Sequence, residues 1–262
     1  MSRIVTIGSA LQDIYMLDRD DFEGLELDDG VSIFGRMAIG SKIDIDKVNF
    51  AVGGGGTNAA VSLARGGHEV IFMGNIGRDA SGDAILECLD RENIDSSYVE
   101  YVSGHTGCSV ILLDVRSAER TILTYRGASA SFGNLNPDDL ENIQPDWLYV
   151  TSLRGDMDTL LKFFEKAHQL GAKVMFNPGE LELAQLRKLV GLLDLVDVLL
   201  VNKEEAAQIV PGVLLTELLS RLANYCPAVL ITDGMMGAIA TNREKTYRLG
   251  VYEQGRVRDR TG

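Results

Sequence analysis

The sequence predicts an α/β protein with a mostly parallel central sheet, and two observations point to this fold class. From the middle of the chain onward, short apolar runs alternate with helical patterns, which is typical of a parallel sheet covered on both faces. Several of these runs end in polar residues, as expected where the carboxyl ends of parallel strands form a binding edge. The expected strands are Arg3–Ile7, Trp147–Thr151, Val174–Asn177, Val198–Asn202 and Val229–Thr232.

Two helices between these strands follow from the spacing of their apolar residues. The segment Met157–Leu170 carries Leu160, Leu161 and Phe164 on one helical face. A second helix is expected where leucines recur at positions 214, 215, 218, 219 and 222. Each helix therefore has an apolar face to place against the sheet.

Two segments interrupt the alternation, because they contain strand-like patterns and no helix. They are Val31–Val52 and Cys108–Tyr125, and the second is divided by the polar turn Arg116–Glu119. We expect both to pair into one small antiparallel sheet that stands off the main domain, closes over the binding site as a lid, and serves as a homodimer face. The alternative is an extra sheet layer within a single domain.

The glycine run Gly53–Gly56 is the most informative stretch of the chain. A strand pattern, Val48–Val52, leads into it, and a helix, Thr57–Arg65, leaves it. Glycine N–H groups and a helix N-terminus can face a polar or anionic ligand, and Asn58 adds a side-chain donor and acceptor. This arrangement predicts a binding site for a small polar molecule.

Two other interpretations of the glycine run remain open. It could be a flexible turn, or Gly54-x-Gly56-x-x-Ala59 could be a dinucleotide-binding pattern. The dinucleotide pattern normally follows the first strand of a protein, whereas here the first strand lies far upstream. No acidic residue ends a second strand about 20 positions further on, so the sequence disfavours this alternative.

Composition limits the possible partners. The chain has 25 Lys and Arg against 38 Asp and Glu, a net charge of −13, which disfavours nonspecific binding to nucleic acid or to an anionic membrane. The three cysteines form no C-x-x-C pair, and the three histidines share no metal-ligand spacing. The first residues resemble a strand rather than a signal peptide, and no apolar run reaches membrane-spanning length. We therefore expect a cytoplasmic protein.

Two motifs carry a resemblance to a known family. Gly53–Ala60 (GGGGTNAA) and Gly74–Gly82 (GNIGRDASG) resemble the G-G-x-x-x-N-x-A and G-x-x-G-x-D-x-x-G signatures of the ribokinase family, also called PfkB-type carbohydrate kinases. Six matches in family order, over the whole length, make the resemblance specific. The other four are Asp13, Asn202–Glu205 (N-x-x-E), Ile231–Ala238 and Asp259–Gly262, the opening of a D-x-T-G-A-G-D signature.

The resemblance implies a ribokinase-like three-layer α/β/α fold with a small β-sheet lid, formed by about residues 31–52 and 108–125 of a single kinase domain over 1–262. It also implies transfer of the γ-phosphoryl group of ATP to a hydroxyl of a sugar or nucleoside, with Mg²⁺ as a cofactor and K⁺ as a candidate monovalent ion. The sequence contains no G-x-x-x-x-G-K-[ST] motif, so this is not a P-loop kinase.

On the acceptor side, the resemblance implies that Asp13 and Asn58 hold substrate hydroxyls. Gly54 and Gly55 would allow the substrate ring to approach closely. From the residues alone, Asp13 could instead serve a turn or a cap at a strand end.

On the nucleotide side, the resemblance implies phosphate, metal and adenosine contacts. Asn202 and Glu205 could equally be the cap and first turn of a helix, and only the family order favours a role with ATP. The implied residues are Asn202, Glu205 (Mg²⁺, through water), Thr232, Gly234, Gly237, Thr261, Gly262 and Asp259 (a monovalent cation).

The sequence departs from the family pattern in one respect. It ends at Gly262, before the Ala-Gly-Asp that completes the last signature, and in the family that aspartate is the general base. We therefore expect a C-terminally incomplete domain with no catalytic base and little kinase activity. A non-catalytic sugar- or nucleoside-binding protein on the same fold, and an NAD(P)-binding Rossmann dehydrogenase, are the alternatives. The family motifs leave the acceptor open.

Overall fold

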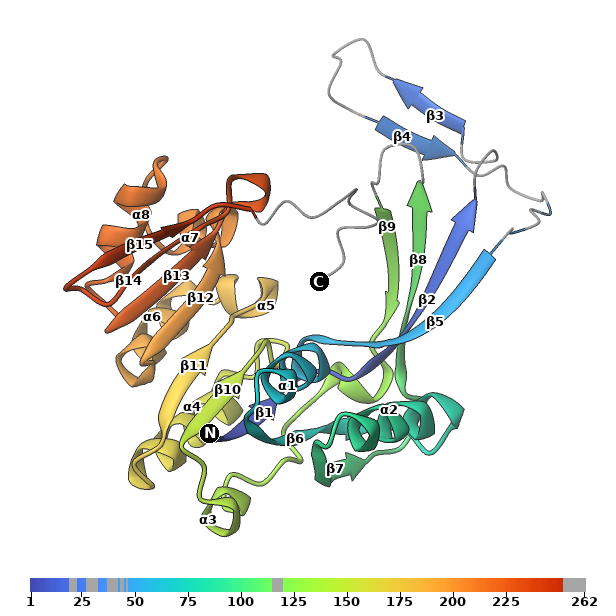
Figure 1. Ribbon diagram of the computed structural model, residues 1–262, viewed down its shortest axis with the longest axis horizontal. Helices are drawn as coiled ribbons and strands as arrows, with labels where there is room; N and C mark the ends of the chain where they lie inside the picture. Colours follow the sequence, from blue (N-terminus) through green and yellow to red (C-terminus); the bar gives the residue numbers. More distant parts are fainter. Residues whose placement is uncertain are drawn as a thin grey trace.

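The computed structural model describes residues 1–18, 23–26, 33–36, 42, 45, 47–114 and 120–251. A nine-stranded sheet forms the body, in the order β15-β14-β13-β12-β11-β10-β1-β6-β7 (Figure 1). The strands from β13 to β7 in this order are parallel, and β14 and β15 add an antiparallel hairpin at one edge. The strands are β1 Arg3–Ile7, β6 Glu69–Ile76, β7 Asp95–Tyr101, β10 Trp147–Val150, β11 Lys173–Phe176, β12 Val198–Asn202, β13 Ala228–Thr232, β14 Ala238–Thr241 and β15 Thr246–Leu249.

Helices cover both faces of this sheet, as the sequence predicted. Alternate residues of β6 enter opposite cores: Val70 and Phe72 belong to one, and Ile71 and Met73 to the other. Among the described residues, no helix is both long and apolar enough to cross a bilayer. The helices are α1 Gly55–Arg65, α2 Ala80–Arg91, α3 Asp139–Ile143, α4 Met157–Gln169, α5 Glu180–Leu183, α6 Leu186–Leu192, α7 Lys203–Ile209 and α8 Leu215–Leu222, with short 3₁₀ turns η1 Gly127–Ala130, η2 Leu193–Leu195 and η3 Gly234–Met236.

The two cores divide the helices between the faces of the sheet. Ala60 of α1 and Ile85 of α2 pack with Val70 and Phe72. The larger core contains residues of α4, α6 and α8, such as Phe163, on the opposite face. This is the three-layer α/β/α arrangement.

A second sheet rises from the body as a lid (Figure 1). Its order is β5-β2-β8-β9, with β2 at Leu11–Asp18, β5 at Lys47–Gly53, β8 at Gly107–Asp114 and β9 at Arg120–Tyr125. The prediction that the two helix-free segments share one small sheet is confirmed for the parts of them that form β5, β8 and β9. The prediction missed β2, which lies between them and pairs antiparallel with β5 and parallel with β8.

The expectation that the whole of Val31–Val52 joins this sheet is wrong in one part. Residues Ile33–Arg36 form β4, which pairs with β3 (Glu23–Glu26) in a separate two-stranded sheet. Between β4 and β5, only residues 42 and 45 are described, and the predicted turn Arg116–Glu119 lies outside the described residues.

Candidate functional site

The predicted site residues fall into two groups at the carboxyl edge of the parallel strands. One group surrounds the turn after β1, against which the N-terminus of α1 packs. The other lies at the ends of β12 and β13, where Asn202 and Thr232 are register partners. Strands β11 and β10 separate β12 from β1, so three strand spacings, about 14 Å, lie between the two groups.

The glycine-rich loop is held by Ser9, which follows β1. The Gly55 N–H donates to Ser9 Oγ at 3.1 Å, and the Gly56 and Thr57 N–H groups donate to the Ser9 carbonyl at 3.1 and 3.4 Å. The N–H groups of Gly55, Gly56 and Thr57 are therefore accepted by the chain itself, contrary to the expectation that the N–H groups at this point face a ligand. Sequence reasoning missed Ser9.

The close contact between the loop and Ser9 requires a glycine at position 54. Its φ is +106°, a conformation that L side chains rarely adopt, and an added Cβ would lie 2.4 Å from the Ser9 carbonyl oxygen. This glycine therefore serves the packing of the loop against the turn after β1. A ligand at this loop would then meet side chains rather than the N–H groups of Gly55, Gly56 and Thr57.

Asp13 supplies such a side chain from strand β2. Its carboxylate lies directly over Gly53, where an added Cβ would be 2.0 Å from Asp13 Oδ2. Ser109 of β8 hydrogen-bonds the carboxylate, and partial burial raises its pKa above the ordinary 3.8. Asn58 lies exposed on the first turn of α1, at the same mouth.

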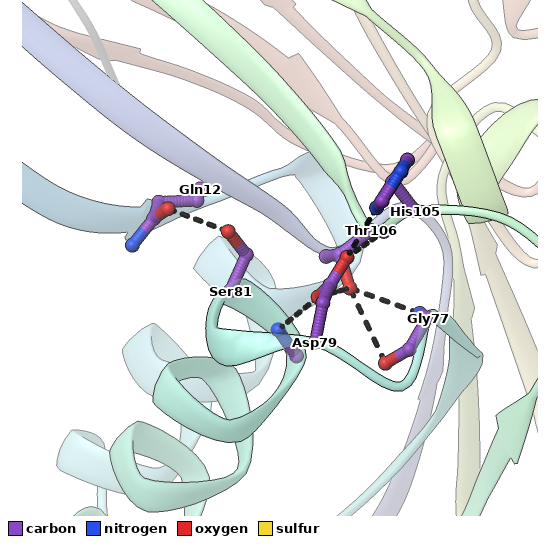
Figure 2. Close-up of polar contacts among 7 residues, drawn as sticks. Gln12, Gly77, Asp79, Ser81, His105 and Thr106 are labelled. Atoms are coloured by element: carbon purple, nitrogen blue, oxygen red, sulfur yellow. Dashed lines mark hydrogen bonds and ion pairs between the residues drawn. The ribbon is translucent and has the colours of Figure 1, made fainter.

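The second glycine motif fastens the lid to the body (Figure 2). Asp79 caps α2 by accepting the Gly82 N–H at 2.9 Å, and it also accepts the Thr106 N–H at 2.8 Å and the Thr106 hydroxyl at 2.6 Å. Ser81 donates to Gln12 of β2 at 2.6 Å. The N-terminus of α2 is thus tied to β2 and to Thr106, the residue that precedes β8.

The electrostatics of Asp79 match these contacts. Burial alone would raise its pKa, but hydrogen bonds from Thr106 and from the Gly82 N–H lower it from 3.8 to about 2. His105 Nδ1 lies 3.4 Å from Asp79 Oδ2. This carboxylate is therefore ionised and acts as an anchor rather than as a proton acceptor at neutral pH.

Between the two groups, a buried carboxylate shapes the loop after β10. Glu182 of α5 accepts the Ser152 hydroxyl and the Gly155 N–H, both at 2.7 Å, and the Gly179 N–H at 3.0 Å. Sequence reasoning missed Glu182, because nothing in its local pattern distinguishes it from Glu180, the exposed acid beside it. Its three bonds join the loops that follow β10 and β11, the two strands between the two groups of predicted site residues.

In the group of residues predicted to bind the nucleotide, Asn202 and Glu205 form a reciprocal cap at the start of α7. Asn202 Oδ1 accepts the Glu205 N–H at 2.8 Å, and Glu205 Oε2 accepts the Asn202 N–H at 2.9 Å. Burial raises the pKa of Glu205 above its ordinary value. The helix cap that the sequence offered as an alternative for these residues is therefore present in the structure. A role toward phosphates would be in addition to this cap.

The turn after β13 carries the remaining predicted nucleotide residues. Thr232 ends the strand, and Gly234 and Gly237 adopt φ of +47° and +86° on either side of η3. An ion pair of 3.3 Å between Lys203 Nζ and Asp233 Oδ2 joins this turn to α7. The structure thus places Asn202, Thr232 and both glycines together, whereas Asp259, Thr261 and Gly262 lie outside the described residues.

The described residues provide little for direct metal binding. No group of three or more His, Cys, Asp or Glu side chains among them could hold a metal ion. Glu205 is a single half-buried carboxylate at the sheet edge. One carboxylate suits Mg²⁺, which retains several water ligands and needs few protein oxygens.

The topology also argues against the dinucleotide-binding alternative for the glycine run. The glycine loop follows β5, which belongs to the lid sheet, and not a strand of the parallel sheet. A Rossmann phosphate loop instead connects a strand of the parallel sheet to its crossover helix. The Rossmann dehydrogenase alternative therefore does not fit.

Ribokinases are among the curated relatives with sequence similarity. A ribokinase from Haemophilus influenzae is 27% identical over 209 residues, which cover 75% of this chain and 65% of the relative. The match therefore spans slightly less than two thirds of that relative's length.

Solved structures share the fold. The adenosine kinase from Sinorhizobium meliloti superimposes with a TM-score of 0.80 at 19% identity, covering 100% of this chain and 83% of that chain. The Arabidopsis thaliana ribokinase complexed with ribose and ATP gives a TM-score of 0.77 at 22% identity, covering 98% and 80%. The predicted ribokinase-like fold is confirmed. The sequence model of the pfkB carbohydrate kinases matches residues 1–262, so this chain belongs to the pfkB family of carbohydrate kinases.

Proposed function

We propose that this protein transfers the γ-phosphoryl group of ATP to a hydroxyl of a small sugar-like or nucleoside-like acceptor. The observation that carries the proposal is the position of the Asp13 carboxylate, which is held over the glycine loop, at the base of the lid. The nucleotide turn lies at the other end of the same sheet edge. Phosphoryl transfer depends mainly on such positioning and on charge neutralisation.

Asp13 and Asn58 bind the acceptor in this proposal. A carboxylate accepts hydrogen bonds from two hydroxyls, and an amide both donates and accepts. Asp13 is partly desolvated, so a hydroxyl that replaces its water gains more than it would at an open surface. Gly54 and Gly55 keep side chains away from the acceptor at this point.

Thr232, Gly234 and Gly237 line the adenosine side, and Asn202 and Glu205 lie toward the phosphates. Glu205 would hold Mg²⁺ through water, and the metal would neutralise phosphate charge when bound. Thr261 and Gly262 are proposed to contact phosphate, and Asp259 a monovalent cation such as K⁺.

We also propose that the protein forms a homodimer through the lid. The outer lid strands expose large apolar side chains: Phe50 on β5 is 66% exposed, and Leu123 and Tyr125 on β9 are 55% and 53% exposed. Exposed apolar patches of this kind are typical of protein interfaces. Sedimentation of the parent and of a Phe50→Ser variant tests this, and a parent that remains monomeric at all concentrations would contradict it.

The kinase proposal is tested by ADP release with the gene product, including any sequence that follows Gly262. Acceptors are neutral sugars, charged sugars and nucleosides. Asp13→Ala should reduce turnover with the best acceptor by at least about 100-fold, whereas Asp83→Ala, an exposed acid on α2, should not. Acceptor binding without any ADP release would favour the non-catalytic binding protein, and equal turnover by Asp13→Ala and the parent would reject the assignment of Asp13.

A further inference from the structure

Two arginines flank the turn between β1 and β2 from opposite sides. Arg126 follows the last lid strand, β9, and Arg154 lies in the loop after β10. The function proposed above uses neither residue. Both side chains are exposed, although the chain as a whole is strongly acidic.

Backbone contacts bring both arginine segments to the acceptor site. Three residues after Arg126, the Ser129 hydroxyl accepts the Ala10 N–H and donates to the Ala10 carbonyl, both at 3.2 Å. On the other side, the Thr151 N–H donates to the Ile7 carbonyl at 3.0 Å, and an added Cβ on Gly8 would lie 2.0 Å from Thr151 Oγ1. Ser9, between these two contacts, holds the glycine loop, so the two segments converge on the same turn.

The loop that presents Arg154 is fixed in an unusual conformation. Arg154 has a φ of +62°, which is costly for a residue other than glycine. The loop is locked by Glu182, which accepts from Ser152 and Gly155, and by Gln185, which donates to the Gly155 carbonyl at 2.8 Å. An unfavourable backbone held by so many bonds is typical of a functional position.

The two guanidinium groups are close enough for their charges to interact. Although Arg126 is largely exposed, desolvation by its protein surroundings and the nearby charge of Arg154 lower its pKa. Across the part of the chain that the structure describes, neither side chain makes an ion pair or a hydrogen bond. Two adjacent unpaired positive charges disfavour each other unless an anion lies between them.

Resting on the proposed kinase function, we infer that the acceptor carries an anionic group, a carboxylate or a phosphate, which Arg126 and Arg154 bind while Asp13 holds its hydroxyls. Guanidinium groups match carboxylate and phosphate oxygens in geometry and charge. At the base of the lid, Leu11 of β2 pairs with Gly107 of β8, which lies against the Arg126 carbonyl. Arg126 is thus two strand spacings, about 10 Å, from the strand of Asp13. An anionic group bound by Arg126 would therefore stay apart from the Asp13 carboxylate.

The position of the pair favours the acceptor over the nucleotide. Arg126 belongs to the base of the lid, whereas the nucleotide turn follows β13, three strands beyond β10 in the sheet. Substitution of either arginine should therefore leave ATP affinity unchanged. A loss of ATP affinity with unchanged acceptor affinity would overturn the inference.

The test is calorimetric titration with pairs of acceptors that differ in charge. One pair is D-gluconate and D-glucitol, and the other is fructose 6-phosphate and fructose, so the two pairs separate carboxylate from phosphate. We expect the anionic member of one pair to bind at least about 10-fold more tightly than its neutral partner, and this preference to weaken as salt is raised. Equal affinities within both pairs would overturn the inference.

Variants assign the preference to the two arginines. Arg126→Gln and Arg154→Gly should each weaken binding of the preferred anion about 10- to 100-fold and leave its neutral partner unchanged. Arg154→Gly should keep its Tm, because glycine adopts φ +62° without strain, so its effect is not one of misfolding. Arg187→Gln, an exposed arginine on α6, is the matched control and should change nothing.

The same experiment separates this inference from the kinase proposal. Neutral acceptors that bind as tightly as anionic ones, and lose affinity in Asp13→Ala but not in the arginine variants, would overturn the inference and leave the kinase proposal intact. Failure of every charged and neutral acceptor to bind would count against both.

Discussion

Asp79 ties α2 to the lid, so replacing its carboxylate should weaken the join between lid and body. In Asp79→Asn, the amide oxygen can still accept the Gly82 N–H, but an amide NH₂ then faces the Thr106 N–H. At about 1.4 kcal/mol per pKa unit, a pKa that falls from 3.8 to about 2 corresponds to roughly 2 kcal/mol. The side chain is 24% exposed, so we expect solvent screening to leave about 1–2 kcal/mol of lost stability.

The assay is urea or thermal unfolding of Asp79→Asn and of Asp83→Asn, an exposed acid in the same helical turn. A loss of 1–2 kcal/mol should lower Tm by about 3–6 °C in a chain of this size, whereas the control should lose about 0.5 kcal/mol or less. Because the pKa of Asp79 is lower in the folded state, its contribution is fully present above pH 3.8 and is lost as pH falls toward about 2. Equal losses in both variants, or a difference that does not shrink below pH 4, would refute the reasoning.

Three further substitutions follow from the site geometry. Gly53→Ala places a Cβ 2.0 Å from Asp13 Oδ2, so it should displace the carboxylate and weaken acceptor binding at least about 10-fold, as measured by calorimetry. Gly191→Ala is the control and should leave binding unchanged, because the space around Gly191 is open. Asp13→Asn should keep or raise Tm at pH 7 while acceptor affinity falls. Burial raises the folded-state pKa of Asp13, so the ionised carboxylate destabilises the fold above pH 3.8. A marked fall in Tm would contradict this. Glu182→Gln should cost about 2–3 kcal/mol in urea unfolding, because an amide NH₂ would meet a donor in the buried site, and an effect as small as that of the exposed Glu180→Gln would contradict it.

The sequence predicted most elements of the parallel sheet because each strand is a short apolar run with polar ends. Val198–Asn202 is the clearest case, since its observed bounds coincide with the expected ones. The strand β2 was missed because Leu11–Asp18 mixes polar and apolar residues without strict alternation. Its parallel partner β8 begins 96 positions further along the chain, and local patterns do not report such distant pairing.

The site was predictable to the extent that its residues occur in motifs. Asp13 was assigned to the same site as Gly54 and Gly55, and the structure holds its carboxylate against Gly53, the first residue of that glycine run. The use of the glycine-loop N–H groups by Ser9 could not be predicted, because it depends on how the turn after β1 meets α1, 46 residues away. Glu182 was missed for a similar reason, since its burial arises only when α5 packs against the loop after β10.

The most direct test of the central claim is detection of the phosphorylated acceptor itself. The gene product is incubated with ATP, Mg²⁺ and its best acceptor, and the acceptor is analysed by mass spectrometry while ADP is quantified. Our account predicts that the acceptor gains one phosphoryl group in equal amount to the ADP formed, and that both are lost in Asp13→Ala and retained in Asp83→Ala. ADP formed without a phosphorylated acceptor, or unchanged phosphorylation in Asp13→Ala, would contradict it.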